Sequence, residues 1–328
     1  MMVEQIRSFR DRVLQINENN FEEIALDIFR FQALGNPVYA EYLRNIGIDA
    51  GSVKAFSGIP FMPIRFFRSH RVQAGSWKPE AIFRSSGTTG MVTSSHEVDD
   101  LSFYQAHSRK IFEELFGPLQ GTNLIAVLPS YTERNDSSLV AMVDWFVRCT
   151  RSSLSGFFKP DLELVSTQLD KARSSGRPTV LIGVTFALLD LVAAGVDLSG
   201  VTIIETGGMK GRRKEIIREE LHALLHEARP ARICSEYGMT ELLSQAYALD
   251  GPVFRTPSAM RVMFREVNDP FSPPVKQGQG ILMVADLANV HSCCFLETQD
   301  LGKGNESGFE VLGRVDHSDI RGCSLLTA

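Results

Sequence analysis

A glycine- and hydroxyl-rich segment in the first third of the chain has the residue types that bind phosphate. Residues 83–90 read FRSSGTTG and follow a short apolar run that predicts a strand. Glycines allow turns that aim consecutive backbone N–H groups into one concavity, and small hydroxyl side chains add donors without bulk. The segment predicts a loop for an oligophosphate, and an ordinary surface loop is the alternative. The candidate residues are Ser85, Ser86, Gly87, Thr88, Thr89 and Gly90.

A second segment brings four chemically different residues within five positions. Residues 234–242 read CSEYGMTEL and follow the strand-like run ARIC; the four residues are Tyr237, Gly238, Thr240 and Glu241. An aromatic face can stack on a purine, a threonine can donate to a phosphate, and a carboxylate can hold Mg²⁺. The alternative is a strand-to-helix turn in which Tyr237 is half-buried and Glu241 is an acid of the first helical turn.

Two further candidate segments lie near the C-terminus. Residues 297–304 read ETQDLGKG, and residues 313–322 read GRVDHSDIRG. Asp300, just beyond a predicted buried strand, can accept hydrogen bonds from both hydroxyls of a ribose, and Arg314 can bind an oxygen of the same nucleotide. Taken singly, the two segments are also typical of turns.

The elements that would position these residues follow from hydrophobic periodicity. The first fifty residues predict an amphipathic helical hairpin, with Asn20 as an N-cap and Glu23 at the third helical position. From residue 99 the chain alternates between helices, expected near 99–116, 137–149, 186–194 and 212–228, and strands, expected at 123–129, 179–184 and 201–206. Such alternation predicts a parallel sheet wrapped by helices, which is an α/β fold.

After residue 250 the pattern changes to short strand-like runs divided by Gly, Pro and Asn. These runs predict a mostly antiparallel subdomain, with 272–280 as a hairpin loop. Residues 51–80, which hold prolines and glycines between aromatic clusters, predict a loop-rich covering segment. We therefore expect a helical segment at 1–50, a nucleotide-binding α/β core at 51–250, a β-rich subdomain at 251–313 and a tail at 314–328.

Composition excludes several classes of protein. The chain has 328 residues, 44% of them hydrophobic and 22% charged, which is typical of a globular protein rather than a disordered one. Its 34 Lys+Arg against 39 Asp+Glu give a net charge of −5, so no overall basic footprint predicts nucleic-acid binding. No apolar stretch is long enough to cross a bilayer and no secretory signal begins the sequence, so we expect a cytoplasmic protein.

The five cysteines include no C-x-x-C pair, which fits neither a disulfide framework nor a structural zinc site and favours a reducing compartment. The adjacent Cys293 and Cys294 are expected to alternate faces of a strand and to serve packing. Signatures of P-loop, dinucleotide-binding and serine-hydrolase proteins are absent from the sequence. His222 and His226 share a helix face, but Ala223 stands where a zinc-protease motif needs Glu.

Taken in order, the motifs resemble the signature of the adenylate-forming superfamily, which includes acyl-CoA synthetases and phenylacetate-CoA ligases. The ordered motifs are SSGTTG, the glycine pair Gly207–Gly208, EYGMTE, TQDLG and GRVD. Within that superfamily the chain resembles the LuxE-type acyl-protein synthetases, because of DIFRFQALGNPVY at 27–39, ETGGMKGRR at 205–213 and DIRGCSLL at 319–326. The resemblance covers nearly the whole chain and implies the large N-terminal domain of an adenylate-forming enzyme.

The resemblance implies ATP and Mg²⁺ as cofactors and assigns roles to the motif residues. The loop from Ser85 to Gly90 would hold the β- and γ-phosphates, Tyr237 would stack on adenine, and Thr240 would contact the α-phosphate. Glu241 would bind Mg²⁺, and Asp300 would hold the ribose with Arg314 nearby. Gly207 and Gly208 would form a backbone wall of the adenine and acyl-carboxylate site, and Asp316 stands at the position of the family's hinge residue.

The sequence departs from the family pattern in two ways. Met91 follows the last glycine of the phosphate loop, where many members have a lysine or arginine. Only a few residues follow the hinge motif, so we expect most of the mobile C-terminal lid domain, with its catalytic lysine, to be missing. The tail instead carries Cys323, which the resemblance makes the candidate acceptor of the acyl group; an incidental tail cysteine is the alternative.

These residues predict a two-step ligase. A carboxylic acid, fatty or otherwise hydrophobic, would be activated as acyl-AMP and transferred to Cys323, then to a protein partner such as an acyl reductase or acyl carrier protein. The alternatives are an acyl- or aryl-CoA ligase and a non-catalytic nucleotide- or acyl-binding subunit. Phe61, Phe66, Phe67 and Phe103 are candidates for the acyl pocket or for the core. Lys210, Arg212, Arg213 and Lys214 form either a solvated helix face or a docking patch for an acidic partner.

Overall fold

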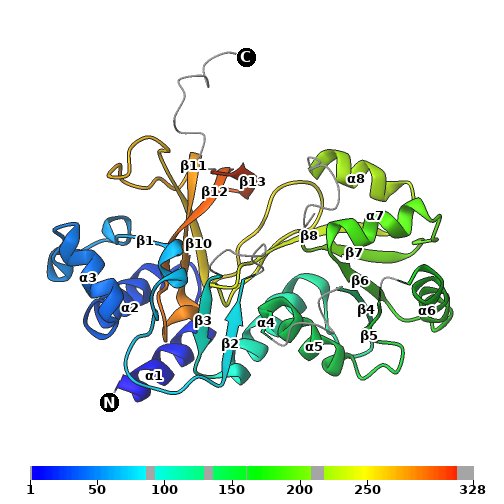
Figure 1. Ribbon diagram of the computed structural model, residues 1–328, viewed down its shortest axis with the longest axis horizontal. Coiled ribbons are helices and arrows are strands. Elements are labelled where there is room, and N and C mark those ends of the chain that lie inside the picture. Colours follow the sequence, from blue (N-terminus) through cyan, green and yellow to red (C-terminus); the bar gives the residue numbers. More distant parts are fainter. Residues whose placement is uncertain (1, 86–92, 129–135, 160, 208–217, 316–328) are drawn as a thin grey trace, which may run out of the picture.

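The two halves of the chain are built around two different sheets. The computed structural model describes residues 2–85, 93–128, 136–159, 161–207 and 218–315. Figure 1 shows the three N-terminal helices beside the antiparallel strands in one half, and the parallel strands with their helices in the other. The α/β architecture expected from the sequence, with parallel and antiparallel parts, is confirmed.

The parallel half is a six-stranded sheet in the order β5-β4-β6-β7-β8-β9, in which only β9 is antiparallel to its neighbour. Strands β4 and β6 have no polar side chain after their first residue and are buried along their whole length, because helices cover both faces. The strands are β4 (Asn123–Val127), β5 (Gly156–Phe157), β6 (Thr179–Gly183), β7 (Val201–Glu205), β8 (Arg232–Tyr237) and β9 (Ala246–Ala248).

Five helices belong to this half of the chain, counted over the described residues. They are α4 (Leu101–Phe116), α5 (Ser138–Thr150), α6 (Leu162–Ser174), α7 (Thr185–Ala193) and α8 (Arg218–His226). Helix α6 and strand β5 were missed by the sequence analysis. Helix α6 begins at the N-cap Asp161, whose side chain accepts from the Leu164 amide, and buries Val165, Leu169 and Ala172 at helical spacing.

The second sheet runs in the order β1-β12-β11-β10, with β13 paired to β12. Its strands are β1 (Met62–Pro63), β10 (Met260–Arg265), β11 (Gly278–Asp286), β12 (Phe295–Asn305) and β13 (Gly308–Arg314). Strands β10, β11, β12 and β13 pair in succession, each antiparallel to the next, which confirms the expected change of pattern after residue 250. Residues 266–277 form the hairpin loop between β10 and β11. Only β1, from the covering segment, pairs in parallel.

One expectation about this sheet was wrong. Asp300 does not lie beyond a strand, and the segment 297–304 that contains it is strand rather than turn. Asp300 is inside β12 and stands directly opposite Arg314 of β13. Cross-strand partners have side chains about 5 Å apart at Cβ, so the register itself brings the two charges together.

Three helices, α1 (Met2–Leu14), α2 (Phe21–Gly35) and α3 (Pro37–Asn45), form the N-terminal segment. Asn20 is the N-cap residue of α2, as expected, but its side chain accepts from the Asn17 amide and makes no capping hydrogen bond. Gln32 of α2 donates to the Asn289 and Val290 carbonyl oxygens and accepts from the Cys294 amide. These buried bonds fix the helices to the antiparallel sheet.

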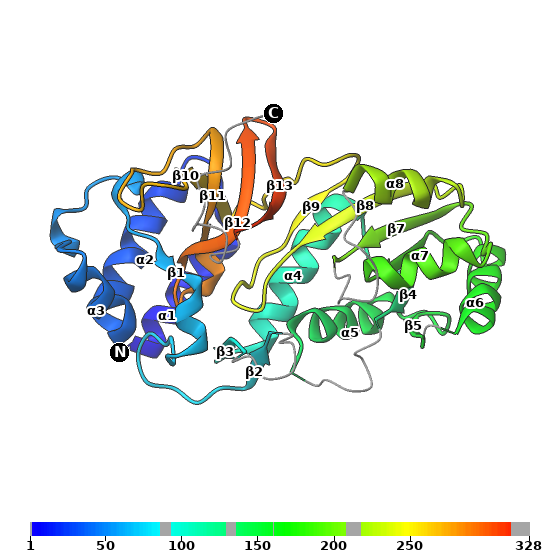
Figure 2. The same cartoon turned by 45° about the horizontal axis from the view of Figure 1, so that its top comes forward.

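Short 3-10 helices fill the covering segment and one strand end: η1 (Ala50–Ser52), η2 (Phe56–Gly58), η3 (Ile64–Arg68) and η4 (Leu287–Asn289). A two-stranded hairpin of β2 (Ala81–Arg84) and β3 (Ser95–Val98) stands beside them. Figure 2 shows α4 between the two sheets. None of the helices in the described ranges is both long and apolar enough to cross a bilayer.

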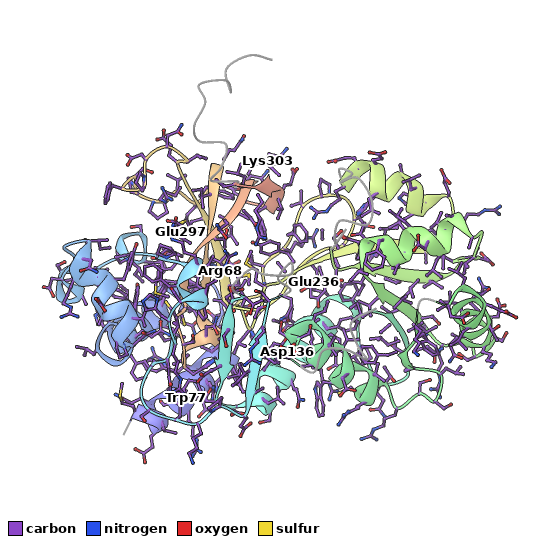
Figure 3. The ribbon with its side chains drawn as sticks, viewed as in Figure 1. Arg68, Trp77, Asp136, Glu236, Glu297 and Lys303 are labelled. Carbon is purple, nitrogen blue, oxygen red and sulfur yellow. The ribbon has the colours of Figure 1, made fainter. Side chains whose placement is uncertain are left out.

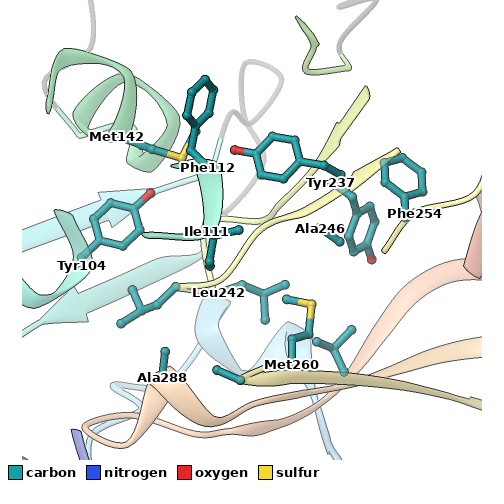
Figure 4. Close-up of a cluster of buried hydrophobic side chains, with 14 of the residues drawn as sticks. Tyr104, Ile111, Phe112, Met142, Tyr237, Leu242, Ala246, Phe254, Met260 and Ala288 are labelled. Carbon is teal, nitrogen blue, oxygen red and sulfur yellow. The ribbon is translucent and has the colours of Figure 1, made fainter. Parts of the chain in front are cut away.

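A continuous hydrophobic core joins the two halves. Figure 4 shows side chains from α4, α5, β8, β9 and β10 packed together, including Phe112, Met142, Ala246 and Met260. Each large apolar side chain buried there contributes roughly 1.5–3 kcal/mol to folding. Of the phenylalanines considered for an acyl pocket, Phe61, Phe67 and Phe103 are buried in this core and Phe66 packs partly buried against it.

Candidate active site

A cavity of about 260 Å³ lies where the two sheets meet. It is lined by residues from η3, from the two ends of the segment that joins β2 to β3, from the turn after β8, and from β12 and β13. Its lining includes five of the residues singled out in the sequence: Ser85, Gly238, Thr240, Glu241 and Arg314. Segments that are more than two hundred residues apart in the chain thus contribute to one polar site.

Two hydrogen bonds between Ser85 and Ser94 join the ends of the segment that contains the predicted phosphate loop. The Ser85 amide donates to the Ser94 carbonyl oxygen at 3.1 Å, and the Ser94 amide donates to Ser85 Oγ at 2.9 Å. These bonds continue the β2–β3 ladder by one further pair, so the chain leaves and re-enters the hairpin beside the cavity. Both Ser85 and Ser94 line the cavity, whereas Ser86 to Gly90 and Met91 lie outside the described residues.

The turn after β8 presents Thr240 and Glu241 to the cavity. The alternative of a strand-to-helix turn was wrong, because no helix follows β8. The chain instead reverses at 238–245 and returns as the antiparallel strand β9. The turn is tied down by its backbone: the Thr240 carbonyl oxygen lies 2.8 Å from His96 Nδ1, and the Glu241 carbonyl oxygen accepts from Asn289 Nδ2 at 2.7 Å.

Tyr237, Asp300 and Arg314 form a connected set beside the cavity. The Tyr237 hydroxyl donates to Asp300 Oδ2 at 3.1 Å, and Arg314 Nε lies 3.4 Å from Asp300 Oδ1. The Tyr237 ring packs edge-on against Phe309 with ring centroids 5.3 Å apart. Burial raises the pKa of Asp300, while Arg314 and the Tyr237 hydroxyl lower it. Two oxygens of one carboxylate are thus held by two predicted site residues.

Glu241 carries the only carboxylate among the described residues that line the cavity. Burial raises the pKa of Glu241, and the opposing effects come from the Ser94 side chain and from the charges of Arg314 and Arg68. The described part of the chain contains no cluster of three His, Cys, Asp or Glu side chains suited to a metal ion. Mg²⁺ is commonly held by one or two carboxylates together with substrate phosphates, so this donor set fits Mg²⁺ that arrives with a phosphate.

Gly207 follows β7 by two residues and is not among the residues that line the cavity. Its φ of +74° is the left-handed conformation that glycine adopts at little cost, and its amide donates to Glu205 Oε1 at 2.6 Å. The same oxygen accepts from Thr185 Oγ1 at 2.6 Å. Gly207 thus has a fixed backbone at the carboxyl edge of the parallel sheet, where open α/β sheets bind ligands. Gly208 lies outside the described residues.

Besides Glu241 in the turn, an acidic residue, Glu236, lies on β8 directly before Tyr237. Burial, with a further effect of the nearby Glu205 carboxylate, raises the pKa of Glu236 to about 8. Glu236 stands opposite Tyr247 of β9, whose buried hydroxyl has no hydrogen-bond partner in the described part of the chain. At neutral pH the Glu236 carboxyl is therefore mostly protonated.

The sequence analysis missed two cations of the cavity. Arg65 and Arg68, both on η3, line it with exposed side chains; Figure 3 shows Arg68 near the junction of the two halves. Residues three apart in a 3-10 helix lie on the same side, so both guanidinium groups face one way while Ile64 and Phe67 are buried. The spacing of two arginines around buried apolar residues in IRFFR is the signal that was available.

Further lining residues that the sequence reasoning did not single out are Ile64, Ser94, Met239 and Gln299.

The described cysteines lack the features of a reactive thiol. Burial raises the pKa values of Cys234 and Cys293 to about 12 and also raises those of Cys149 and Cys294. Cys293 and Cys294 precede β12 and are both fully buried, so they do not alternate faces of a strand as expected. Cys323, Asp316 and the basic run from Lys210 to Lys214 lie outside the described residues.

Comparisons with known proteins were made by sequence and by structure. No protein family model matches the sequence, and a search of curated protein sequences finds no match. Among solved structures, the chain is similar to MbtA from Mycobacterium smegmatis with a TM-score of 0.50 and 15% identity, over 72% of this chain and 46% of MbtA.

Two further similar structures have lower scores. E. coli MenE, with a bound analogue of OSB-AMS, gives a TM-score of 0.48 and 15% identity over 74% of this chain and 50% of MenE. Coronafacic acid ligase from Pectobacterium brasiliense gives 0.45 and 16% over 64% and 43%. The chain thus spans half or less of the length of each of these three proteins. Its fold is that of the large N-terminal domain of adenylate-forming enzymes.

Proposed function

We propose that the chain is an ATP-dependent ligase that activates a carboxylic acid as an acyl-adenylate. The observation that carries the proposal is the convergence of Ser85, Thr240, Glu241 and Arg314, drawn from three separate motifs, on one polar cavity. The resemblance of the ordered motifs to adenylate-forming enzymes and the fold both support this function. The acid is a fatty acid or another hydrophobic one.

In the first step a carboxylate oxygen attacks the α-phosphorus of ATP, and the bond from that phosphorus to the bridging oxygen breaks, so that pyrophosphate leaves. The side chains of the cavity serve this step by position and charge. Thr240 donates to an α-phosphate oxygen, and the guanidinium groups of Arg65 and Arg68 offset the charge on the leaving pyrophosphate. When bound, Mg²⁺ neutralises phosphate charge, and Glu241 is the side chain that would hold it.

The nucleoside end of ATP would lie along β8 and β12. Asp300 is the acceptor for the ribose hydroxyls, and the Tyr237 hydroxyl together with Arg314 holds its carboxylate in one orientation. The backbone of Gly207, and by the motif that of Gly208, would bound the adenine and acyl-carboxylate side of the site. Residues Ser86 to Gly90 would contribute N–H and hydroxyl donors to the β- and γ-phosphates.

In the second step we propose that Cys323 receives the acyl group. Its thiolate attacks the acyl carbonyl carbon, the bond to the AMP oxygen breaks, and a thioester and AMP result. A thiol with an ordinary pKa of about 8.5 is only a few per cent ionised at neutral pH, but the thiolate is a strong nucleophile. The acyl group would then pass to a protein partner such as an acyl reductase or acyl carrier protein.

Incubation with a labelled fatty acid and Mg·ATP tests the proposal. We expect label on the polypeptide that hydroxylamine removes, and loss of that label in Cys323→Ser while acyl-AMP still forms. Label that appears only on added coenzyme A would overturn the acyl-protein step and favour a CoA ligase. Absence of any ATP-dependent product, with no exchange of pyrophosphate into ATP, would overturn the ligase itself and leave a binding subunit.

A further inference from the structure

His96, on β3, occupies a fully buried position behind the cavity. Its imidazole packs edge-on against Phe67 of η3, with ring centroids 5.4 Å apart, and stacks on His291 at the same distance with 15° between the planes. The ring is completely covered. Its place is therefore fixed by packing on two sides, and it does not touch the space that a ligand would fill.

Within the described residues, the one hydrogen bond of the His96 side chain goes to the turn that carries Thr240 and Glu241. His96 Nδ1 lies 2.8 Å from the Thr240 carbonyl oxygen. A carbonyl oxygen only accepts hydrogen bonds, so Nδ1 must carry the proton. Burial lowers the pKa of His96 to about 4, so the ring is neutral at physiological pH and Nε2 is unprotonated.

Nε2 of His96 has no hydrogen-bond partner within the described ranges of the chain. A buried polar atom left unpaired costs about 1–3 kcal/mol, and few such atoms are found in folded proteins. An apolar ring would pack at this position without that cost. What the imidazole adds over such a ring is one N–H, directed at Thr240.

The neighbouring carbonyl oxygen is held in a similar way. Asn289 of η4 donates to the Glu241 carbonyl oxygen, and the Asp286 carboxylate accepts from the Leu243 and Ser244 amides at 2.8 and 2.9 Å. Two successive carbonyl groups of the turn are thus bound by buried side chains from outside it. With the backbone fixed on the protein side, the side chains of Thr240 and Glu241 lie at the cavity.

We propose that His96 is a positioning residue that holds the Thr240 backbone, and through it the Thr240 and Glu241 side chains, in the orientation that binds Mg·ATP. The effect of His96 on Mg·ATP binding rests on the proposed function, whereas its role in holding the turn at 238–245 does not. His96 acts through the backbone and touches no substrate. Asn289 supports the same turn from the antiparallel half.

Three substitutions separate the N–H from the ring. His96→Phe keeps the packing against Phe67 and His291 but removes the donor. In His96→Asn the side-chain amide nitrogen is as many bonds from Cα as Nδ1, so it can donate to Thr240. His96→Gln places its amide nitrogen one bond further along, at the level of Nε2, and serves as the matched control for the loss of the ring.

The measurements are the dissociation constant for Mg·ATP and the hydrogen exchange of peptides that cover residues 238–245. We expect His96→Phe and His96→Gln to weaken Mg·ATP binding about tenfold and to speed exchange in that peptide about tenfold, because one buried carbonyl group loses its donor. Exchange in β6 should not change. His96→Asn should restore both quantities to within about threefold of the wild type.

Unchanged exchange at 238–245 in His96→Phe, or equal losses in all three variants, would overturn the inference. If the exchange changes as expected but the wild type binds no Mg·ATP, the proposed function fails while the hold on the turn stands. Nitrogen NMR of the histidine-labelled wild type gives a test that needs no folded variant: a neutral ring with its proton on Nδ1 is expected for His96, and a proton on Nε2 would overturn the inference.

Discussion

The turn at 238–241 and the 3-10 helix η3 line the same cavity but are held in different ways. The turn has its carbonyl groups bound by His96 and Asn289, and Glu241 is only 7% exposed. In η3 the arginines have exposed side chains, and of its five residues only Ile64 and Phe67 are buried. One wall thus has a fixed geometry, and the other supplies charge on long side chains that can adjust.

The difference assigns different tasks to the two walls. Preorganised groups stabilise a transition state because they need no reorganisation when charge moves, which suits the fixed turn. Flexible guanidinium groups suit a leaving group that must depart, since their attraction is strong but their geometry is loose. We therefore expect substitutions of the turn's own side chains to lower mainly the rate of adenylation, and substitutions in η3 to weaken mainly the binding of phosphate.

Glu241→Gln should give the largest effect. The amide keeps the shape but loses the charge that would hold Mg²⁺, so the rate of pyrophosphate exchange should fall about 10²–10³-fold. Binding of Mg·ATP should weaken far less. Glu97→Gln, beside Arg71 and outside the cavity, is the control and should keep the wild-type rate. A Glu241→Gln enzyme with a normal rate and a normal requirement for Mg²⁺ would remove the carboxylate from the mechanism.

Arg68→Gln should weaken Mg·ATP binding about tenfold with little effect on the rate at saturation, which is the reverse of the pattern at the turn. Because the interaction is with an exposed charge, the defect should shrink as ionic strength rises. Arg71→Gln is the matched control, since Arg71 follows three residues later and pairs with Glu97 outside the cavity. Inorganic tripolyphosphate should show the same loss. Equal behaviour of the two variants would show that η3 has no part in phosphate binding.

Asp300→Asn should weaken the binding of both ATP and AMP about fivefold to tenfold, because an amide oxygen still accepts from Tyr237 but no longer attracts Arg314 or accepts as strongly from a ribose. Tripolyphosphate binding should not change. Calorimetry with the three ligands compares this variant with Arg68→Gln. A loss confined to ligands that lack a ribose would contradict the assignment of Asp300 to the sugar.

The fold was more predictable from the sequence than the cavity. Strands β4 and β6 have no polar side chain after their first residue, so burial on both faces follows from the residues themselves. Helix α6 was missed because its charged residues outnumber the three apolar ones that face the sheet. The sequence motifs identified Tyr237, Thr240, Glu241, Asp300 and Arg314 as candidates, and the structure brings them into or beside one cavity; their roles remain predictions.

What the sequence could not provide was the pairing between distant segments. The contact of Asp300 with Arg314 depends on the register of β12 and β13, which shifts at an irregularity beside Leu301. The contribution of Arg65 and Arg68 depends on a single turn of 3-10 helix in a segment without long-range periodicity. His96 could not be singled out, because its partner is a backbone oxygen 144 residues away.

Glu236→Gln should have the smallest effect on activity, because Glu236 does not line the cavity; its effect is on the free energy of unfolding and on the pH dependence of that energy. The folded state raises the pKa of Glu236 from 4.5 to about 8, so the folded protein binds the proton more tightly than the unfolded chain does. Stability should then fall as pH rises from about 4.5 to about 8, because ionisation is favoured only in the unfolded chain. The glutamine variant has no such penalty, and its advantage over the wild type should grow with pH to about 1 kcal/mol or more above pH 8. Urea unfolding of both proteins at pH values below and above this range measures the difference. A pH-independent difference would mean that the folded protein does not raise the pKa of Glu236.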